Sequence, residues 1–186
     1  MSKILISGYY GFANAGDEAM LTAIIESLRQ VEKNVELTVL SGNPEDTAAK
    51  HQVCSVYRFN PLGIIRAMKD SELIISGGGS LLQDVTSKRS LLYYLSIIGL
   101  GKFFGKKVML FSQGIGPIRA KWARKLTSLV CNEVDLITVR DSESAVELIE
   151  MGVKPEKITV TADSVLSLNP VTKECGQYLL QEAGVD

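Results

Sequence analysis

The stretch at residues 8–21, GYYGFANAGDEAML, has the side chains of a sugar-binding turn. Aromatic rings can stack on the apolar face of a sugar, and nearby amide and carboxylate groups can bond its hydroxyls. The pattern therefore predicts a close-approach backbone loop that binds a sugar. The alternative is that the acidic residue only complements a helix dipole while the rings fill the core. The candidate side chains are Tyr10, Phe12, Asn14 and Asp17.

The same turn argues against two other kinds of glycine-rich site. Gly11 and Gly16 have the outer spacing of a triphosphate-binding loop, but Asp17 and Glu18 stand where that loop carries a lysine and a hydroxyl. A carboxylate there would repel a triphosphate, which argues against NTP hydrolysis. The turn also lacks the G-x-G-x-x-G pattern, and the next strand pattern ends in Ser-Gly-Asn without the acid that bonds a ribose, which argues against a nicotinamide enzyme.

A glycine triplet follows a second apolar run, ELIIS. Three consecutive glycines exceed what a tight turn needs, and they can bring exposed backbone N–H groups to an anion or a sugar. We therefore predict ligand contacts from Gly77, Gly78 and Gly79. Gln83 and Asp84 follow closely, and they either reach the same cleft or form a solvated first turn of a helix.

Arg140 directly follows the apolar run DLITV. A guanidinium at the carboxyl end of a strand suits bidentate binding of a phosphate or a carboxylate. The alternative is an ion pair with Asp141 or Glu143. Asp163 has the equivalent place after KITVT, where it either orients a hydroxyl or pairs with Arg140.

The elements that would position these side chains alternate between strand and helix patterns. The strand patterns cover 4–7, 35–40, 52–57, 72–76, 107–112, 135–139 and 157–161. The helical patterns cover 17–31, 61–69, 90–104, 119–132, 142–151 and 175–183. Nearly continuous apolar strands separated by helices predict a doubly wound α/β domain with a parallel sheet.

In such a sheet, ligands bind beyond the carboxyl ends of the strands. Five loops that follow strand patterns carry the unusual residues, and we expect them to form one site. These loops are 8–17, 77–84, 113–117, 140–141 and 163–164.

Composition narrows the class of protein. The chain is 46% hydrophobic and 22% charged with a formal net charge of −1, which argues against a nucleic-acid binder. Three separated cysteines fit neither a disulfide framework nor a zinc site, and we expect reduced thiols and no metal site. His51 is expected in an exposed loop. A strand pattern by Ile4 leaves no room for a signal peptide, so we expect a cytoplasmic protein.

The domain boundary is expected near Pro170. Residues 1–170 would form the α/β domain, and 171–186 would begin a second domain or form a C-terminal helix. The helical pattern at 175–183 has no following strand to pack beside, so we expect the chain to be the first half of a longer protein.

Five motifs in this order resemble the polysaccharide pyruvyl transferase family, in particular its cell-wall-anchoring branch, from Met1 to about Pro170. They are GYYGFANAGDEAML, LIISGGGSLLQD, SQGIGP, TVRDSES and TADSVL. The resemblance implies the N-terminal half of a GT-B-like fold, in which two Rossmann-like domains face one cleft. It also implies transfer of a pyruvate ketal from phosphoenolpyruvate, without a cofactor, to an N-acetylmannosamine-type sugar of a lipid-linked cell-wall precursor.

Ketal formation requires an acid, stabilisation of an oxocarbenium-like centre and a base for the attacking hydroxyl. On the resemblance, Asp17 contacts or deprotonates the acceptor and Arg140 binds an anionic group of phosphoenolpyruvate. The catalytic histidine of the family lies in the second half of its fold, and His51 does not match it.

A lipid-linked acceptor implies peripheral association with the inner face of the membrane, and the resemblance leaves a homo-oligomer open. Two alternatives remain at this point. One is a GT-B-type glycosyltransferase that uses a nucleotide-sugar, and the other is a non-catalytic sugar-binding module.

Overall fold

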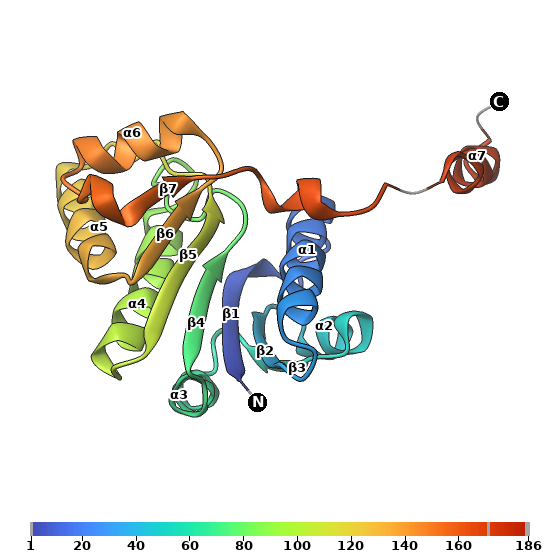
Figure 1. Ribbon diagram of the computed structural model, residues 1–186, viewed down its shortest axis with the longest axis horizontal. Helices are drawn as coiled ribbons and strands as arrows, with labels where there is room; N and C mark the ends of the chain where they lie inside the picture. Colours follow the sequence, from blue (N-terminus) through green and yellow to red (C-terminus); the bar gives the residue numbers. More distant parts are fainter. Residues whose placement is uncertain (1, 171, 185–186) are drawn as a thin grey trace.

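One parallel sheet organises the part of the chain that the computed structural model describes, residues 2–170 and 172–184 (Figure 1). Its seven strands have the order β3-β2-β1-β4-β5-β6-β7, and every neighbouring pair is parallel. The strands are β1 (Lys3–Tyr10), β2 (Glu36–Ser41), β3 (Cys54–Tyr57), β4 (Leu73–Gly77), β5 (Lys107–Gln113), β6 (Leu136–Val139) and β7 (Ile158–Val160). The predicted Rossmann-like fold class is therefore confirmed.

Helices connect the strands and cover both faces of the sheet (Figure 1). They are α1 (Ala15–Val31), α2 (Pro44–His51), α3 (Pro61–Asp70), α4 (Lys88–Phe103), α5 (Lys121–Glu133), α6 (Ser142–Glu150) and α7 (Lys173–Glu182). Two short 3-10 turns are η1 (Pro155–Lys157) and η2 (Ser164–Ser167). Within residues 2–170 and 172–184, none of the helices has both the length and the apolarity that a membrane crossing needs.

The core lies on the two faces of the central strands. On one face, Ile6 and Ile75 pack with Ile24 of α1, and on the other, Leu5 and Ile74 belong to the cluster that α3 and α4 complete. Because both faces are buried, these strands are apolar at successive positions instead of alternating with polar residues. This is why the sequence predicts them well.

The strand order reverses between β1 and β4. β1 pairs with β2 on one side and with β4 on the other, and Ser7 lies opposite Ser76. The helix after β1 therefore covers one face and the helix after β4 the other, which leaves a crevice between the two loops. The expectation that the first two glycine-rich loops share one edge is correct.

Helix α2 is absent from the sequence-based prediction. The predicted turn at residues 41–44 continues into a helix, in which Pro44 occupies the first turn and the side chain of Asn43 accepts a hydrogen bond from the Asp46 N–H at 3.4 Å. Asn-Pro followed by two acids is a helix start. The helix has little apolar character, so periodicity does not reveal it.

Helix α7 begins two residues before the predicted range and lies away from the sheet (Figure 1). Its apolar side chains Tyr178, Leu179 and Leu180 are half exposed.

The start of β6 depends on one carboxylate. Asp135 accepts hydrogen bonds from Lys102 Nζ at 2.6 Å, from the Val108 N–H at 2.9 Å and from Lys107 Nζ at 3.0 Å. Partial burial acts to raise its pKa, but these three bonds outweigh burial and hold the pKa well below its usual range. The carboxylate therefore joins α4, β5 and β6 while it is ionised.

We expect Asp135→Asn to lower the free energy of unfolding at pH 7, because an amide has no charge for the two lysines to pair with. The loss should be only about 1 kcal/mol, because solvent screens this partly exposed group. A depressed pKa stabilises the fold above the unfolded pKa of about 4, and the contribution is lost as the pH falls below it. Urea titrations between pH 7 and pH 2 measure this. In Asp135→Asn the free energy of unfolding should fall less between pH 7 and pH 2 than in the wild type, whereas in Glu133→Gln it should fall as much. Equal pH dependence in both variants would contradict the prediction.

Candidate functional site

A cavity of about 390 Å³ lies where the strand order reverses, and we call it the switch-point pocket. Its wall comes from the end of β1 and the start of α1, the loop after β4 and the first turns of α4. The lining residues are Tyr9, Asn14, Asp17, Ser80, Leu81, Gln83, Thr86, Ser90 and Tyr94. Three of the predicted site residues, Asn14, Asp17 and Gln83, thus meet in one cavity.

Asn14 and Asp17 reach the pocket from the start of α1. Asn14 caps the helix, and its Oδ1 accepts hydrogen bonds from the N–H groups of Gly16 at 3.0 Å and Asp17 at 3.3 Å. Asp17 is half-buried, and desolvation followed by the nearby charge of Glu18 raises its pKa. A carboxylate with a raised pKa is a better proton acceptor, so Asp17 can serve as a general base.

Glu18 anchors the glycine-rich loop after β1 through its carboxylate. One carboxylate oxygen accepts a hydrogen bond from the Gly11 N–H at 2.8 Å, and the other lies 3.6 Å from His51 Nε2. Only 10% of the His51 side chain is exposed, so the prediction of an exposed histidine is wrong. The reason is α2, which places His51 at its end and against α1.

Tyr10 is a core residue and not a ligand contact. It is 1% exposed, and its hydroxyl donates a hydrogen bond to the Gly77 carbonyl at 2.6 Å. Burial raises its pKa, so the hydroxyl stays protonated and remains a donor. The prediction that Tyr10 contacts a sugar is wrong, because strand alternation directs its ring into the core and directs that of Tyr9 outward.

The glycine triplet is also buried. The N–H of Gly78 donates to the Phe111 carbonyl at 3.2 Å, and that of Gly79 donates to Met20 Sδ at 2.9 Å. The predicted exposed N–H groups are therefore wrong for these two residues, and Gly77 is the last residue of β4. Gly78 and Gly79 have φ of +70°, and a Cβ on Gly79 would lie 3.0 Å from Asp17 Oδ1. The triplet serves a turn that Asp17 can approach.

Arg140 stands beside the pocket in a polar network. Its Nη2 donates to Ser80 Oγ at 3.1 Å, its Nη1 lies 3.3 Å from Asp163 and its Nε lies 3.4 Å from Asp141. The ion pairs of Arg140 with Asp141 and with Asp163, both considered from the sequence, thus occur together. Glu143 makes no ion pair with Arg140 in the described chain. Because Ser80 lines the pocket, Arg140 and Asp163 connect to it through that hydroxyl.

Gly114 leaves room for this network because it has no side chain. A Cβ at Gly114 would lie 2.6 Å from Ser80 Oγ and 2.8 Å from Arg140 Nη2. Any side chain there would therefore displace the hydrogen bond between Arg140 and Ser80.

Gln83, Asp84 and Phe12 take three different places. The amide of Gln83 faces the pocket while it exchanges hydrogen bonds with Thr86. Asp84 instead accepts from the N–H groups of Arg119 and Ala120, each at 2.9 Å, and these bonds lower its pKa. It anchors the segment before α5, so it lies neither in the switch-point pocket nor in the first turn of a helix, the two places that the sequence left open. The ring of Phe12 lies outside the pocket lining and stacks on Tyr9, with the centroids 4.4 Å apart.

Sequence reasoning missed Tyr9, Ser80, Tyr94 and Arg58. Arg58 directly follows β3 as Arg140 directly follows β6, so the same signal was present. Tyr94 is distant in sequence, and only the packing of α4 brings it to the pocket.

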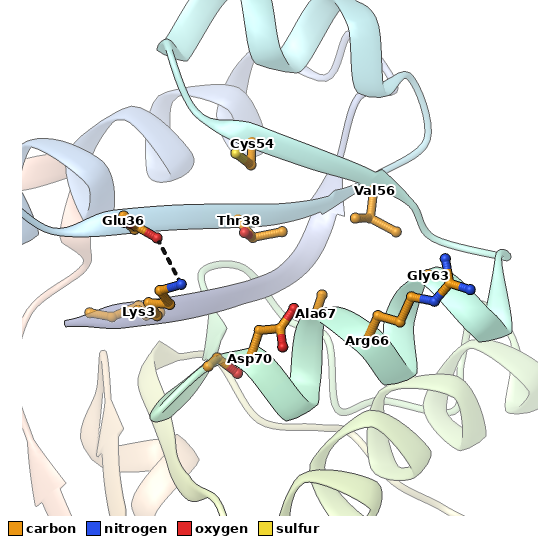
Figure 2. A pocket seen from close by; sticks show the side chains of 11 residues that line it. Lys3, Glu36, Thr38, Cys54, Val56, Gly63, Arg66, Ala67 and Asp70 are labelled. Carbon is orange, nitrogen blue, oxygen red and sulfur yellow. Dashed lines mark ion pairs between the residues drawn. The ribbon is translucent and has the colours of Figure 1, made fainter. Parts of the chain in front are cut away.

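A second cavity, of about 340 Å³, lies at the opposite edge of the sheet and contains none of the predicted site residues (Figure 2). Figure 2 shows Lys3, Glu36 and Cys54 at the amino ends of their strands, with Asp70 of α3 on their side of the cavity and Arg66 pointing along α3 toward Gly63. Lys3 and Glu36 form an ion pair at 3.4 Å. This edge is not where parallel sheets bind ligands.

Comparison with known proteins gives a family and a fold. The sequence model of the polysaccharide pyruvyl transferase family matches residues 14–174. No curated protein matches the chain significantly.

Three solved structures share the fold at low sequence identity. HepE of Anabaena, solved with UDP and glucose, has a TM-score of 0.62 at 12% identity over 99% of this chain and 50% of that chain. The UDP-GlcNAc 2-epimerase of Neisseria meningitidis, bound to UDP-GlcNAc, has a TM-score of 0.57 at 12% identity over 97% and 50%. The lipopolysaccharide outer core galactosyltransferase WaaB has a TM-score of 0.51 at 16% identity over 91% and 46%. The chain thus spans about half the length of these proteins.

We expect Tyr10→Phe to lower the free energy of unfolding by about 1–2 kcal/mol, because the buried Gly77 carbonyl loses its donor. Urea unfolding at pH 7 measures the loss. Tyr9→Phe is the matched control, since the Tyr9 side chain is 40% exposed, and its stability should stay within about 0.5 kcal/mol of the wild type. Equal stability of the two variants would contradict a structural role for Tyr10.

Proposed function

Because this chain belongs to the polysaccharide pyruvyl transferase family, we propose that it transfers pyruvate as a ketal from phosphoenolpyruvate to a sugar of a cell-wall polysaccharide precursor. The acceptor is an N-acetylmannosamine-type sugar on a lipid carrier, which brings the protein to the inner face of the membrane from the cytoplasm. The donor carries the transferred group itself, so the reaction needs no further cofactor.

The observation that carries this proposal is the placement of Asp17. Its carboxylate has a raised pKa, lines a cavity of about 390 Å³ and stands among neutral polar groups that suit a sugar. Asn14 and Gln83 each supply an amide, and Ser80 supplies a hydroxyl. These groups can orient the acceptor so that one hydroxyl faces Asp17.

Ketal formation gives Asp17 and Arg140 different roles. Two acceptor hydroxyls form bonds to the central carbon of phosphoenolpyruvate, the methylene carbon gains a proton, and phosphate leaves with the second proton. Asp17 takes a proton from an attacking hydroxyl. Arg140, which Asp163 and Ser80 hold in place, binds the donor carboxylate with its planar fork.

The first test is turnover of Asp17→Asn in the full-length protein, with phosphoenolpyruvate and a mannosamine-type acceptor. Asparagine keeps the shape but cannot accept the proton, so we expect turnover to fall by about 10²–10⁴-fold with an unchanged melting temperature. In the wild type, the acid limb of kcat/KM should lie above pH 3.8, because the base must be ionised and its pKa is raised from that value.

Glu45→Gln is the control for charge at a helix start, because Glu45 is an exposed acid in the first turn of α2. It should turn over like the wild type. If Asp17→Asn also turned over normally, Asp17 would not be the base and its role would be limited to the helix dipole.

The second test is the donor KM of Arg140→Lys. A point charge cannot replace a bidentate fork, so we expect donor binding to weaken by about 1.5–3 kcal/mol with the fold retained. Steady-state kinetics with varied phosphoenolpyruvate measure it. An unchanged donor KM with normal turnover would leave Arg140 only its ion pairs with Asp141 and Asp163.

A glycosyltransferase that uses a nucleotide-sugar is the second candidate, favoured by fold relatives solved with UDP, UDP-glucose or UDP-GlcNAc. Donor competition separates the two. Transfer that phosphoenolpyruvate supports and nucleotide-sugars do not is the outcome we expect, and the reverse would replace the pyruvyl transferase proposal.

A further inference from the structure

Arg58 is a buried arginine without a partner carboxylate. It is 5% exposed, and the ion pairs among the described residues all involve other side chains. Its Nε and Nη1 have no hydrogen-bond partner, and Nη2 donates only a long bond to Tyr94 Oη at 3.4 Å. A buried charge with unmet donors destabilises a fold unless another group compensates it.

Five aromatic rings surround this guanidinium. Cation–π attraction to these rings offsets part of the cost of burying the charge. It does not replace the hydrogen bonds that Nε and Nη1 lack, because a ring face is not a lone-pair acceptor and the one tyrosine hydroxyl that accepts from Arg58, Tyr94 Oη, is bonded to Nη2. The rings, with their centroid distances from Arg58 Cζ, are Tyr93 (4.4 Å), Phe59 (5.2 Å), Phe12 (5.3 Å), Tyr94 (5.5 Å) and Tyr9 (5.9 Å).

The guanidinium lies directly behind the wall of the switch-point pocket. Tyr9 and Tyr94 line the pocket and also contact Arg58. The Arg58 N–H donates to the Ser41 carbonyl at 2.9 Å, which holds the residue at the carboxyl end of β3. Arg58 therefore belongs to the same edge of the sheet as Asp17.

Two partly exposed aromatic rings, those of Tyr9 and Phe12, cover Arg58 on the solvent side. Tyr9 and Phe12 are 40% and 42% exposed and stack on each other. They flank Gly11, which has φ of +77°, and Ala13 follows with φ of +56°, a left-handed value that costs an alanine free energy. A displacement of this pair would connect the guanidinium to the pocket.

Arg140 differs in this respect. Two carboxylates, Asp141 and Asp163, already compensate its charge, and Ser80 accepts one of its N–H groups. Of the two arginines beside the switch-point pocket, Arg58 is the one that has no carboxylate partner among the described residues.

We propose that Arg58 binds a phosphate group of the ligand that occupies the switch-point pocket, with Tyr9 and Phe12 closing over it. A planar guanidinium with free Nε and Nη1 matches the paired oxygens of a phosphate. The phosphate can belong to phosphoenolpyruvate or to the diphosphate of a lipid-linked acceptor. The choice of these two sources rests on the proposed function, whereas the anion site itself does not.

The test is calorimetric titration of the full-length protein with phosphoenolpyruvate and, separately, with inorganic pyrophosphate. In Arg58→Met the Kd of at least one probe should rise about 10- to 100-fold, the equivalent of the hydrogen bonds to one charged group. The probe that loses more identifies the source of the phosphate. Arg66→Met removes the same charge from α3 at the opposite edge of the sheet, and its Kd values should stay within about twofold of the wild type.

Melting curves without ligand separate binding from a structural role. Methionine packs well among aromatic rings, so Arg58→Met should melt at or above the wild-type temperature. If it melts lower, Arg58→Lys decides, because lysine keeps the charge among the rings but cannot form a fork. Under the proposal it still binds the probe at least about fivefold more weakly.

Three results would overturn the proposal: a wild-type protein that binds neither probe, wild-type affinity for both probes in Arg58→Met, and full rescue of affinity in Arg58→Lys. A protein that binds phosphoenolpyruvate through Arg58 but transfers no pyruvate would instead overturn the proposed function and leave the phosphate site in place.

Discussion

The parallel pairing of β1 with β4 is the constraint on which the site depends. These strands are adjacent in the sheet but separated by two other strands in the sequence, so the helices that follow them pack on opposite faces. Their loops must diverge at the carboxyl edge, and the space between them becomes the switch-point pocket. Tyr10 joins the two strands at this point through its bond to the Gly77 carbonyl.

Charge is distributed unevenly around this pocket. Glu18 is held by the Gly11 N–H and lies near His51, Asp84 is bound by two backbone N–H groups, and Arg140 has two carboxylate partners. Asp17 and Arg58 remain as the groups whose charged forms have few partners. One is an acid with a raised pKa and the other a cation among rings, a combination that suits proton removal beside anion binding.

Much of the fold could be predicted because both faces of the central strands are buried. Runs such as ILI and LII are then apolar at every position, and the helices between them carry an apolar stripe. Helix α2 was not predicted because its capping residues, and not an apolar stripe, define it, and it buries only Thr47. The site could be predicted to the level of loops, since parallel strands bring their carboxyl ends to one edge.

The sequence by itself determined the order of strands and helices and the edge at which the polar loops meet, because both follow from local patterns and chain direction. Tertiary structure alone decided which side chains face the pocket. Tyr9 and Tyr10 are neighbours of the same type on opposite faces of β1, and only the packing of other elements buries one ring and leaves the other exposed. Asp163 and Ser80 reach Arg140 from other loops, and Tyr93 and Tyr94 reach Arg58 from α4, so only packing could decide that one cation meets carboxylates and the other meets rings.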